Sequence, residues 1–260
     1  MNKDSAYFRR AKLMVRTLPY IAVEECFALK GGTAITKAGL KVQEDQSGGR
    51  IHKLFVSDGE HRITIEPNEV LRGAVNEPEV CDISAVAEEA FETSATIRTL
   101  SLADLYGGKL CAALDRQHPR DFFDVMVLLK NEGITDAIRR TFVVYLAGHD
   151  RPIHEVIDPT WKDIRESFDR EFVGMTAQPV KLEELLAARD TFMHQLKTSL
   201  TNEERQFLIS IKEGTPRWDL LGIPGIENLP SLQWKLMNIR KMNKKKHAEY
   251  LKKLRDKLKT

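Results

Sequence analysis

The residues best suited to chemistry lie in the run from Asp115 to Asp124, which reads Asp-Arg-Gln-His-Pro-Arg-Asp-Phe-Phe-Asp. Asp121 and Asp124 are three residues apart and therefore share a helix face. Two interpretations stay open: a dense polar cluster at the mouth of a site, or helix-end electrostatics in which Arg120 pairs with an acid. His118 could act as a general base, or it is simply a loop residue before proline.

A second candidate is the helix expected over residues 101–116, with Ser101 as its N-cap and an acid in its first turn. Gly107 and Gly108 lie in its interior, where each costs roughly 1 kcal/mol relative to alanine. The close approach of another backbone or of a ligand would offset that cost. The helical spacing also predicts two sides of this helix. One side is a stripe formed by Tyr106, Lys109, Ala113 and Arg116, and the other faces the core with Leu102 and Leu105. Lys109 then either points into a phosphate site or extends along the surface.

A third candidate is the segment Lys30-Gly31-Gly32-Thr33. Paired glycines before a helix let backbone N–H groups approach a phosphate, and the helix dipole adds to the attraction. A simple turn is the alternative. The segment is not a P-loop, because no Gly-Lys-Ser/Thr follows at the required spacing.

The elements that must position these residues divide into a mixed front part and a helical rear. We expect a helix over 5–27 interrupted at Pro19, a polar turn-prone stretch over 41–49, and strands over 51–57 and 61–66 joined by an Asp58-Gly59 turn. Further helices are predicted over 119–132 (ended by Gly133), 134–147, 159–172, 181–199, 201–213, 229–239 and 243–258. The expected fold class is α+β, with a core domain over 1–132 and an all-helical domain over 133–260.

The composition excludes several classes of protein. With 42% hydrophobic and 30% charged residues, the chain can bury a core and is not disordered. No apolar run approaches the roughly 20 residues of a membrane-spanning helix, and charges interrupt every apolar segment near the start, so no signal peptide is expected. Cys26, Cys81 and Cys111 are odd in number and widely spaced, which argues against disulfides and zinc and favours the cytoplasm.

The net charge of +2 hides an asymmetry. Residues 240–260, the basic tail, contain ten basic and two acidic residues, for a net charge of +8, which leaves −6 for residues 1–239. Such a tail could bind nucleic acid. A solvated amphipathic helix is the other interpretation, because Ala248, Leu251, Leu254 and Leu258 recur at helical spacing.

Taken together, these motifs resemble the AbiEii/AbiGii nucleotidyltransferase toxins, the toxin halves of type IV toxin–antitoxin and phage abortive-infection systems. The resemblance rests on three blocks: Lys30-Gly-Gly-Thr-Ala, the strand ending Ile65-Glu66-Pro67-Asn68, and Asp104-Leu-Tyr-Gly-Gly-Lys109 continued by Asp115 to Asp124. It covers most of residues 1–240, and the block over 104–124 is its specific part.

The resemblance implies a polymerase-β-like nucleotidyltransferase core that uses Mg²⁺ or Mn²⁺ to move a nucleoside monophosphate from an NTP to an acceptor, with tRNA the acceptor in some relatives. By that resemblance Gly31, Gly32 and Thr33 would hold the triphosphate, and Glu66 would be the strand-borne metal ligand. The downstream catalytic positions would be Lys109, Asp115, Arg120, Asp121 and Asp124. A separately encoded antitoxin would be the partner.

One feature of the family pattern is absent from this sequence. Such enzymes carry an Asp-x-Asp pair on the strand after the Gly-Gly-Thr helix, where strand alternation puts both carboxylates on one face to share metals. The chain contains no Asp-x-Asp, and Asp45 is the only aspartate near the expected place. We therefore expect a missing segment and an impaired transfer reaction. The alternative is a non-catalytic protein that keeps the fold and binds nucleic acid or a partner.

Overall fold

The computed structural model describes residues 5–22, 39–47, 50–66 and 73–259. The chain forms two compact units. Unit 1 contains the residues up to Glu69 together with Pro78–Thr99, and unit 2 contains Val70–Glu77 together with Leu100–Thr260. The units thus divide before the helix that carries Lys109, whereas the sequence suggested a domain boundary after residue 132.

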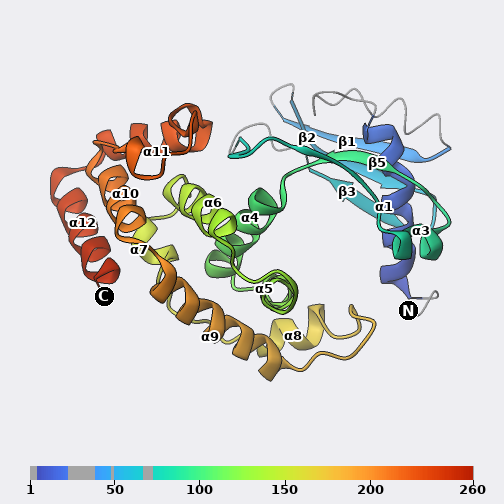
Figure 1. Ribbon diagram of the computed structural model, residues 1–260. Helices are drawn as coiled ribbons and strands as arrows, with labels where there is room; N and C mark the ends of the chain where they lie inside the picture. The colour runs from blue at the N-terminus through green and yellow to red at the C-terminus, as the bar shows by residue number, and fades with distance from the viewer. Residues whose placement is uncertain (1–4, 23–38, 48–49, 67–72, 260) are drawn as a thin grey trace. The chain divides into compact units, whose positions relative to one another are not determined.

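Unit 1 is built on a three-stranded antiparallel sheet in the order β1-β2-β3. The strands are β1 (Lys41–Ser47), β2 (Arg50–Ser57) and β3 (Arg62–Ile65). Helix α1 (Ala6–Ala22) packs on β3, and the small core between helix and sheet contains Leu13, Leu40 and Val56. In Figure 1, α1 is the dark blue helix beside these strands.

Strand β1 corrects the sequence prediction, which treated residues 41–49 as a turn-prone stretch. Its sequence is almost wholly polar, but its backbone forms a full antiparallel ladder with β2, from Lys41 opposite Ser57 to Ser47 opposite Arg50. An edge strand with one solvent-facing side needs few apolar residues, because main-chain hydrogen bonds to its neighbour fix it. Here Val42 packs against the core.

The predicted hairpin between β2 and β3 is confirmed. The Asp58 carboxylate accepts hydrogen bonds from the backbone N–H groups of Glu60 (3.1 Å) and His61 (2.8 Å). Gly59 adopts a φ of +106°, which side-chain-bearing residues rarely adopt. Pro19 does not interrupt its helix: α1 continues through it to Ala22, and the expected extension to residue 27 lies outside the described residues.

Unit 1 also contains a second sheet that the sequence did not reveal. Strands β4 (Glu79–Asp82) and β5 (Thr96–Thr99) pair antiparallel, and α3 (Ala85–Phe91) connects them. Phe91 packs against Phe8 of α1 with ring centroids 5.1 Å apart. Strands of only four residues give too short an alternation to detect from sequence.

Unit 2 is all helical. Its longer helices are α4 (Leu102–Asp115), α5 (Pro119–Asn131), α6 (Asp136–Ala147), α9 (Leu182–Ser199), α10 (Asn202–Glu213), α11 (Pro230–Arg240) and α12 (Lys244–Leu258). Each was predicted within one or two residues at either end. Shorter elements are α7 (Ile153–Val156), α8 (Arg165–Glu171), and the 3₁₀ turns η1 (Trp218–Leu220) and η2 (Ile226–Asn228). The helix predicted over 159–172 is therefore wrong in its first half.

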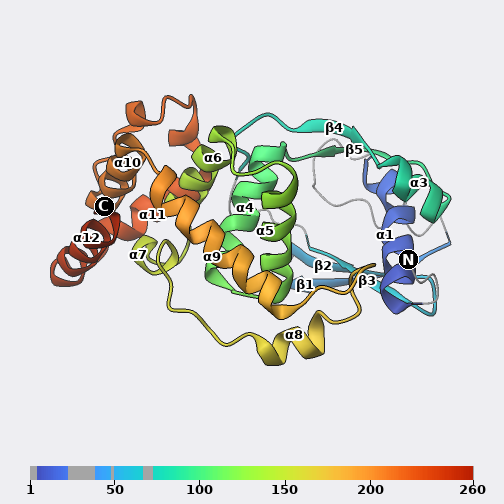
Figure 2. The ribbon, with the colours of Figure 1, turned by 60° about the horizontal axis from the view of Figure 1, so that its bottom comes forward.

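The core of unit 2 is formed where α4 packs on α6 and α5 packs on α9 (Figures 1 and 2). Phe142 of α6 and Phe192 of α9 are fully buried and meet edge to face, 6.3 Å between ring centroids. Gly133 ends α5 with a φ of +68°, as predicted, and its N–H donates to the Leu128 carbonyl.

The predicted α+β class is confirmed by these elements. Cys81 and Cys111 are thiols, the first partly exposed and the second buried, and Cys26 lies outside the described residues. In the described part of the chain, none of the helices combines the length and the apolarity that a bilayer crossing requires.

Candidate functional site

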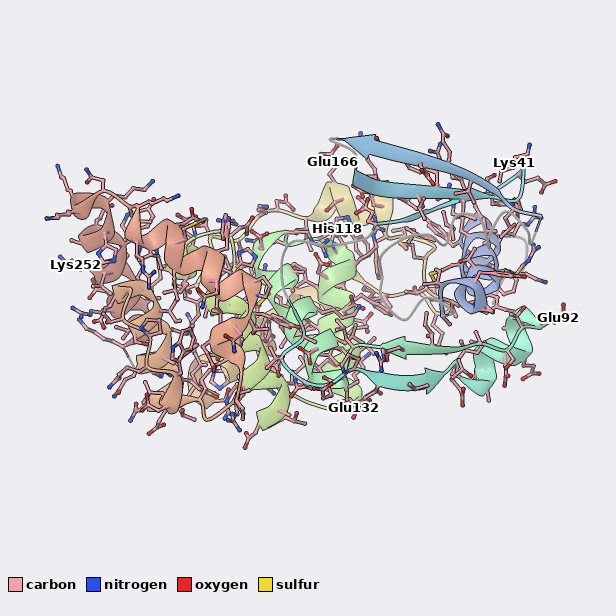
Figure 3. All side chains as sticks on the ribbon, turned by 90° about the horizontal axis from the view of Figure 1, so that it is seen from above. Lys41, Glu92, His118, Glu132, Glu166 and Lys252 are labelled. Atoms are coloured by element: carbon pink, nitrogen blue, oxygen red, sulfur yellow. The ribbon has the colours of Figure 1, made fainter. Side chains whose placement is uncertain are left out.

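The predicted catalytic residues of unit 2 all lie on α4 or α5, and Lys109 and Asp124 form a polar face between the two helices. Ser101 caps α4 by accepting from the N–H of Asp104 at 3.1 Å. His118 caps α5, its Nδ1 accepting from the N–H of Arg120 at 3.2 Å. His118 and Glu132, both labelled in Figure 3, mark the two ends of α5. His118 is thus a helix cap, which is consistent with the loop interpretation made from the sequence.

Lys109 and Asp124 form the central pair of this face. The Lys109 ammonium donates to the Asp124 carboxylate at 2.5 Å, and each side chain is about one-third exposed (35% and 33%). Tyr106 lies close by, and burial together with the negative charges of Asp124 and Glu132 raises the pKa of its phenol. Because Lys109 is partly exposed, its ammonium could bind a phosphate in place of the Asp124 carboxylate.

Asp121 is held inside the helix junction. Its carboxylate is 7% exposed and accepts from Arg116 at two positions, Nη2 at 2.5 Å and Nε at 3.2 Å. One interpretation of the sequence paired Arg120 with an acid at this helix end. In the structure that acid is Glu171 of α8, which Arg120 contacts at 3.4 Å and His118 at 3.1 Å. Hydrogen bonding from His118 and the charges of both neighbours lower the pKa of Glu171.

Asp115 is the last residue of α4 and pairs with Arg151, just before α7, rather than with α8. Its carboxylate accepts from Arg151 at 2.6 Å, and Arg151 also donates to Glu155 at 3.2 Å. The hydrogen bond that Arg151 donates to Asp115 raises the pKa of the Arg151 guanidinium. Arg151 and Glu171 were not among the sequence candidates, and no signal marked them, because they lie more than 30 residues from the charges that they neutralise.

The turn between α4 and α5 contains a residue in an unfavourable backbone conformation. Gln117 has a φ of +58° and is 4% exposed. Its side-chain amide donates to the Thr160 carbonyl at 3.0 Å and accepts from the Lys162 N–H at 2.9 Å. These two bonds tie the turn to the segment before α8 and offset a left-handed conformation that costs about 1–2 kcal/mol.

We therefore expect Gln117→Ala to lower the free energy of unfolding by about 1–2 kcal/mol, because it leaves a carbonyl and an N–H without their partner. Urea unfolding followed by tryptophan fluorescence measures this, since Trp161, Trp218 and Trp234 all lie in unit 2. Gln195→Ala, a partly exposed glutamine on α9, is the control. Equal effects of the two substitutions would contradict a role for the Gln117 amide.

Part of the predicted stripe on α4 is wrong. Ala113 is fully buried, whereas Leu102 and Leu105 are 45% and 42% exposed. The side of α4 that faces the core is therefore not the side that the sequence predicted. Leu110, Cys111 and Leu114 fill the core instead. Gly107 also lies on the buried side, where it closely approaches Thr141 and Phe142 of α6.

Glu66 belongs to unit 1, at the end of β3, and the structure pairs it with a lysine. The Lys53 ammonium lies 2.9 Å from the Glu66 carboxylate. Asp45 of β1 is directly opposite Lys53 in the strand register. Asp45, Lys53 and Glu66 therefore lie in a row across the sheet. Both acids raise the pKa of Lys53, chiefly through the hydrogen bond and charge of Glu66.

A divalent metal does not fit the described residues. Mg²⁺ and Mn²⁺ need several oxygen ligands around one point, and among the described residues no three His, Cys, Asp or Glu side chains come together. Between Asp45 and Glu66 the Lys53 ammonium already supplies the positive charge. Gly31, Gly32 and Thr33 lie outside the described residues, so their predicted phosphate contacts stay a prediction.

The basic tail forms the end of α11 and helix α12. Leu254 and Leu258 are buried against unit 2, which confirms the amphipathic-helix interpretation. Four of its cations are paired with acids: Lys253 with Glu249, Arg255 with Glu213, Lys257 with Asp158, and Lys259 with Asp256. The remaining ones, such as Lys252 (Figure 3), form no ion pair with a described residue and leave a positive surface.

Comparison with known proteins decides the family. A model of the family described as nucleotidyl transferase AbiEii toxin, type IV TA system, matches residues 38–238, which is more than half of the chain. The chain belongs to the AbiEii nucleotidyltransferase toxin family. The matched part of this AbiEii chain includes Glu66 and the 104–124 block, and begins after Thr33.

The solved structures agree with this assignment at the level of the fold. The AbiEii chain is similar to MenT4, a nucleotidyltransferase toxin from Mycobacterium tuberculosis H37Rv, with a TM-score of 0.59 and 13% identity over 92% of this chain and 95% of that chain. A search of curated proteins found no match. The fold is therefore that of a nucleotidyltransferase toxin, as the sequence resemblance implied.

Proposed function

We propose that this chain is the toxin of a type IV toxin–antitoxin pair, acts in the cytoplasm, and has an impaired ability to transfer a nucleoside monophosphate from an NTP to an acceptor. tRNA is the candidate acceptor, Mg²⁺ or Mn²⁺ the metal that transfer would need, and a separately encoded antitoxin the partner. The observation that carries the impairment is the pairing of Glu66 with Lys53, in a chain without Asp-x-Asp.

The polar face of unit 2 supports a remnant of phosphate chemistry. Phosphoryl transfer depends on positioning and on charges around the phosphates. Lys109 is about one-third exposed (35%), and among the described residues no atom lies within 4 Å of the point where a Cβ of Gly108 would be. A triphosphate could approach the Lys109 ammonium along this side of α4 and replace Asp124 as its counterion.

The described residues give little support for the metal-dependent part of the transfer reaction. Nucleotidyl transfer with two metal ions needs carboxylates whose negative charge is available to bind the cations. Asp45 and Glu66 flank Lys53, so a cation there would have to displace an ammonium that both acids stabilise. Asp115 and Asp121 are held by Arg151 and Arg116, which leaves their charge neutralised.

Incubation of the purified full chain with labelled NTPs, total tRNA and either Mg²⁺ or Mn²⁺ tests this proposal. We expect label incorporation near the background without protein, and no further decrease in Lys109→Ala. Lys130→Ala, an exposed lysine on the same helix pair, is the matched control. Robust incorporation that Lys109→Ala abolishes and Lys130→Ala preserves would show an intact transferase and contradict the impairment.

A second candidate function is non-catalytic binding of nucleic acid through the basic tail. Cations of the tail that form no ion pair with a described residue cluster where α11 meets α12: Arg240, Lys241, Lys244, Lys245 and Lys246. If these contact phosphates, the affinity for RNA or DNA should fall steeply with salt, with a slope in log–log form of about −0.7 to −0.9 per phosphate contacted. Filter binding at several salt concentrations measures this, and the slope should lessen when Lys244 and Lys245 are both changed to Ala. An unchanged slope would reject the tail as the binding surface.

A further inference from the structure

A cavity of about 250 Å³ lies within unit 2, where α7, α11 and α12 meet the end of α10. Its walls are largely apolar and include Ile153, Ile239 and Met242. Three nitrogen-bearing side chains also line it: Lys212 of α10, and Lys235 and Asn238 of α11. All three belong to elements that neither the proposed transfer reaction nor the α4–α5 face uses.

Lys212 is a buried ammonium to which no described residue offers an oxygen partner. The residue is 5% exposed. Within the described part of the chain, its Nζ contacts the Met242 sulfur at 3.3 Å and lies 5.3 Å from the centre of the Tyr250 ring, but meets no carboxylate or carbonyl. Burial and the nearby charge of Lys246 lower its pKa. A buried charge with so few partners is costly unless an anion joins it.

Lys235 adds a second buried cation to the same cavity. It is 6% exposed, and its ammonium donates to the carbonyl oxygens of His149 (2.6 Å) and Arg151 (2.7 Å). An ammonium has three N–H donors, so one is left for a ligand. The carbonyls are neutral and do not cancel the charge, and burial lowers the pKa of Lys235 to about 8.

Asn238 supplies a third donor. Its Nδ2 is buried and has no hydrogen-bond partner among the described residues. The acid that lines the cavity, Asp150, is 67% exposed and contacts the His149 ring at 2.9 Å. The cavity therefore offers two cations and an amide donor, against one acid that is directed elsewhere.

We propose that this cavity binds the phosphate monoester of a nucleotide, with the phosphate between Lys212, Lys235 and Asn238. A phosphate monoester carries close to two negative charges at neutral pH, which matches two ammonium groups better than a carboxylate does. The apolar walls and Trp234, a lining residue that is 38% exposed, suit a flat base, since bases stack on aromatic side chains.

The surroundings of the cavity favour the same ligand. Met242, which lines it, lies within the basic segment from Arg240 to Lys246. Lys246 lies 5.3 Å from the centre of the Tyr250 ring, next to Lys212. A polyanion drawn to this surface would bring a terminal phosphate to the cavity. The nucleotide is thus either free or the phosphorylated end of a strand.

Calorimetric titration of the full chain with defined probes tests the proposal. We expect adenosine 5′-monophosphate to bind, inorganic phosphate to bind more weakly, and adenosine not to bind measurably. A 5′-phosphorylated dinucleotide that binds at least ten-fold tighter than the mononucleotide identifies a strand end, and one that does not identifies a free nucleotide. Absence of binding by every phosphorylated probe, or equal binding of adenosine, overturns the proposal.

Two substitutions separate a ligand site from a structural role. Lys212→Met should weaken mononucleotide binding at least ten-fold and raise the melting temperature of the ligand-free protein by about 2–4 °C, because it removes a buried charge that has no anion. Asn238→Leu should also weaken binding. Lys130→Met, an exposed lysine of α5 outside the basic tail, is the control and should change neither quantity. A lower melting temperature with unchanged binding in Lys212→Met would show that the lysine is structural.

Discussion

Asp104→Ala is expected to lower the free energy of unfolding of unit 2 by about 3–5 kcal/mol, the range seen when one partner of a buried charged network is removed. Asp104 is 1% exposed. Its carboxylate accepts from the Tyr145 hydroxyl (2.5 Å), the Ser101 hydroxyl (2.7 Å), and the backbone N–H groups of Val75 (2.7 Å) and Asn76 (3.0 Å).

These contacts make Asp104 the point where three parts of unit 2 are joined. It links α4, in its first turn, to Tyr145 of α6 and to the segment around Asn76. The Asn76 side chain also donates to Asp104 at 2.8 Å and to Thr141 at 3.1 Å. Removal of the carboxylate would leave several buried donors without an acceptor and release the segment that precedes the 104–124 block.

Urea unfolding monitored by tryptophan fluorescence measures the loss, because all three tryptophans lie in unit 2. Asp219→Ala, an exposed aspartate of η1, is the control and should change stability by less than about 0.5 kcal/mol. A loss below 1 kcal/mol for Asp104→Ala would contradict the structural role.

The same residue predicts a pH dependence. Burial opposes ionisation of Asp104, but the hydrogen bonds from Tyr145, Val75, Asn76 and Ser101 outweigh it and lower its pKa. A carboxyl whose folded pKa is depressed contributes its stability above the unfolded value of about 3.9 and loses it as the pH falls through the folded pKa. The stability gap between the natural chain and Asp104→Asn should therefore be full at pH 7 and narrow below about pH 4. A gap that is constant with pH would exclude the carboxylate charge as its cause.

The adjacent glycines of α4 are expected to respond in opposite directions. A Cβ at Gly107 would lie 3.0 Å from a Thr141 methyl and 3.1 Å from the Phe142 backbone nitrogen. Gly107→Ala should therefore destabilise the protein by about 1–3 kcal/mol through overpacking. A Cβ at Gly108 meets no atom of the described residues within 4 Å, so Gly108→Ala should stabilise the helix by about 0.5–1 kcal/mol.

Gly107→Ala and Gly108→Ala serve as matched controls for each other, because they are the same substitution at neighbouring positions. Urea midpoints of the two variants give the signs directly. If the open side of Gly108 admits a nucleotide, Gly108→Ala should also weaken ATP binding while it stabilises the fold. Destabilisation by both substitutions would show that α4 is packed on both sides, and would remove the open approach to Lys109.

Local signals in the sequence identified most of the helical part. The Ser101 cap, the Pro119 start of α5 and the Gly133 end are all set by short-range backbone chemistry, so they could be read from a few residues. The same holds for the Asp58-Gly59 hairpin. Strand β1 could not be identified in this way, because its stability comes from pairing with β2 rather than from its own polar residues.

The same holds for the candidate site, of which the sequence determined one part and the tertiary structure the other. The sequence by itself determined the family block over 104–124, the absence of Asp-x-Asp and the basic tail, since these depend only on residue types and spacing. Only the tertiary structure decided how the charges are used. Lys109 pairs with Asp124, Lys53 lies between Asp45 and Glu66, and Lys212 is buried with no anion among the described residues. Ion pairs and burial depend on distances between residues far apart in the chain, and those distances are set by packing.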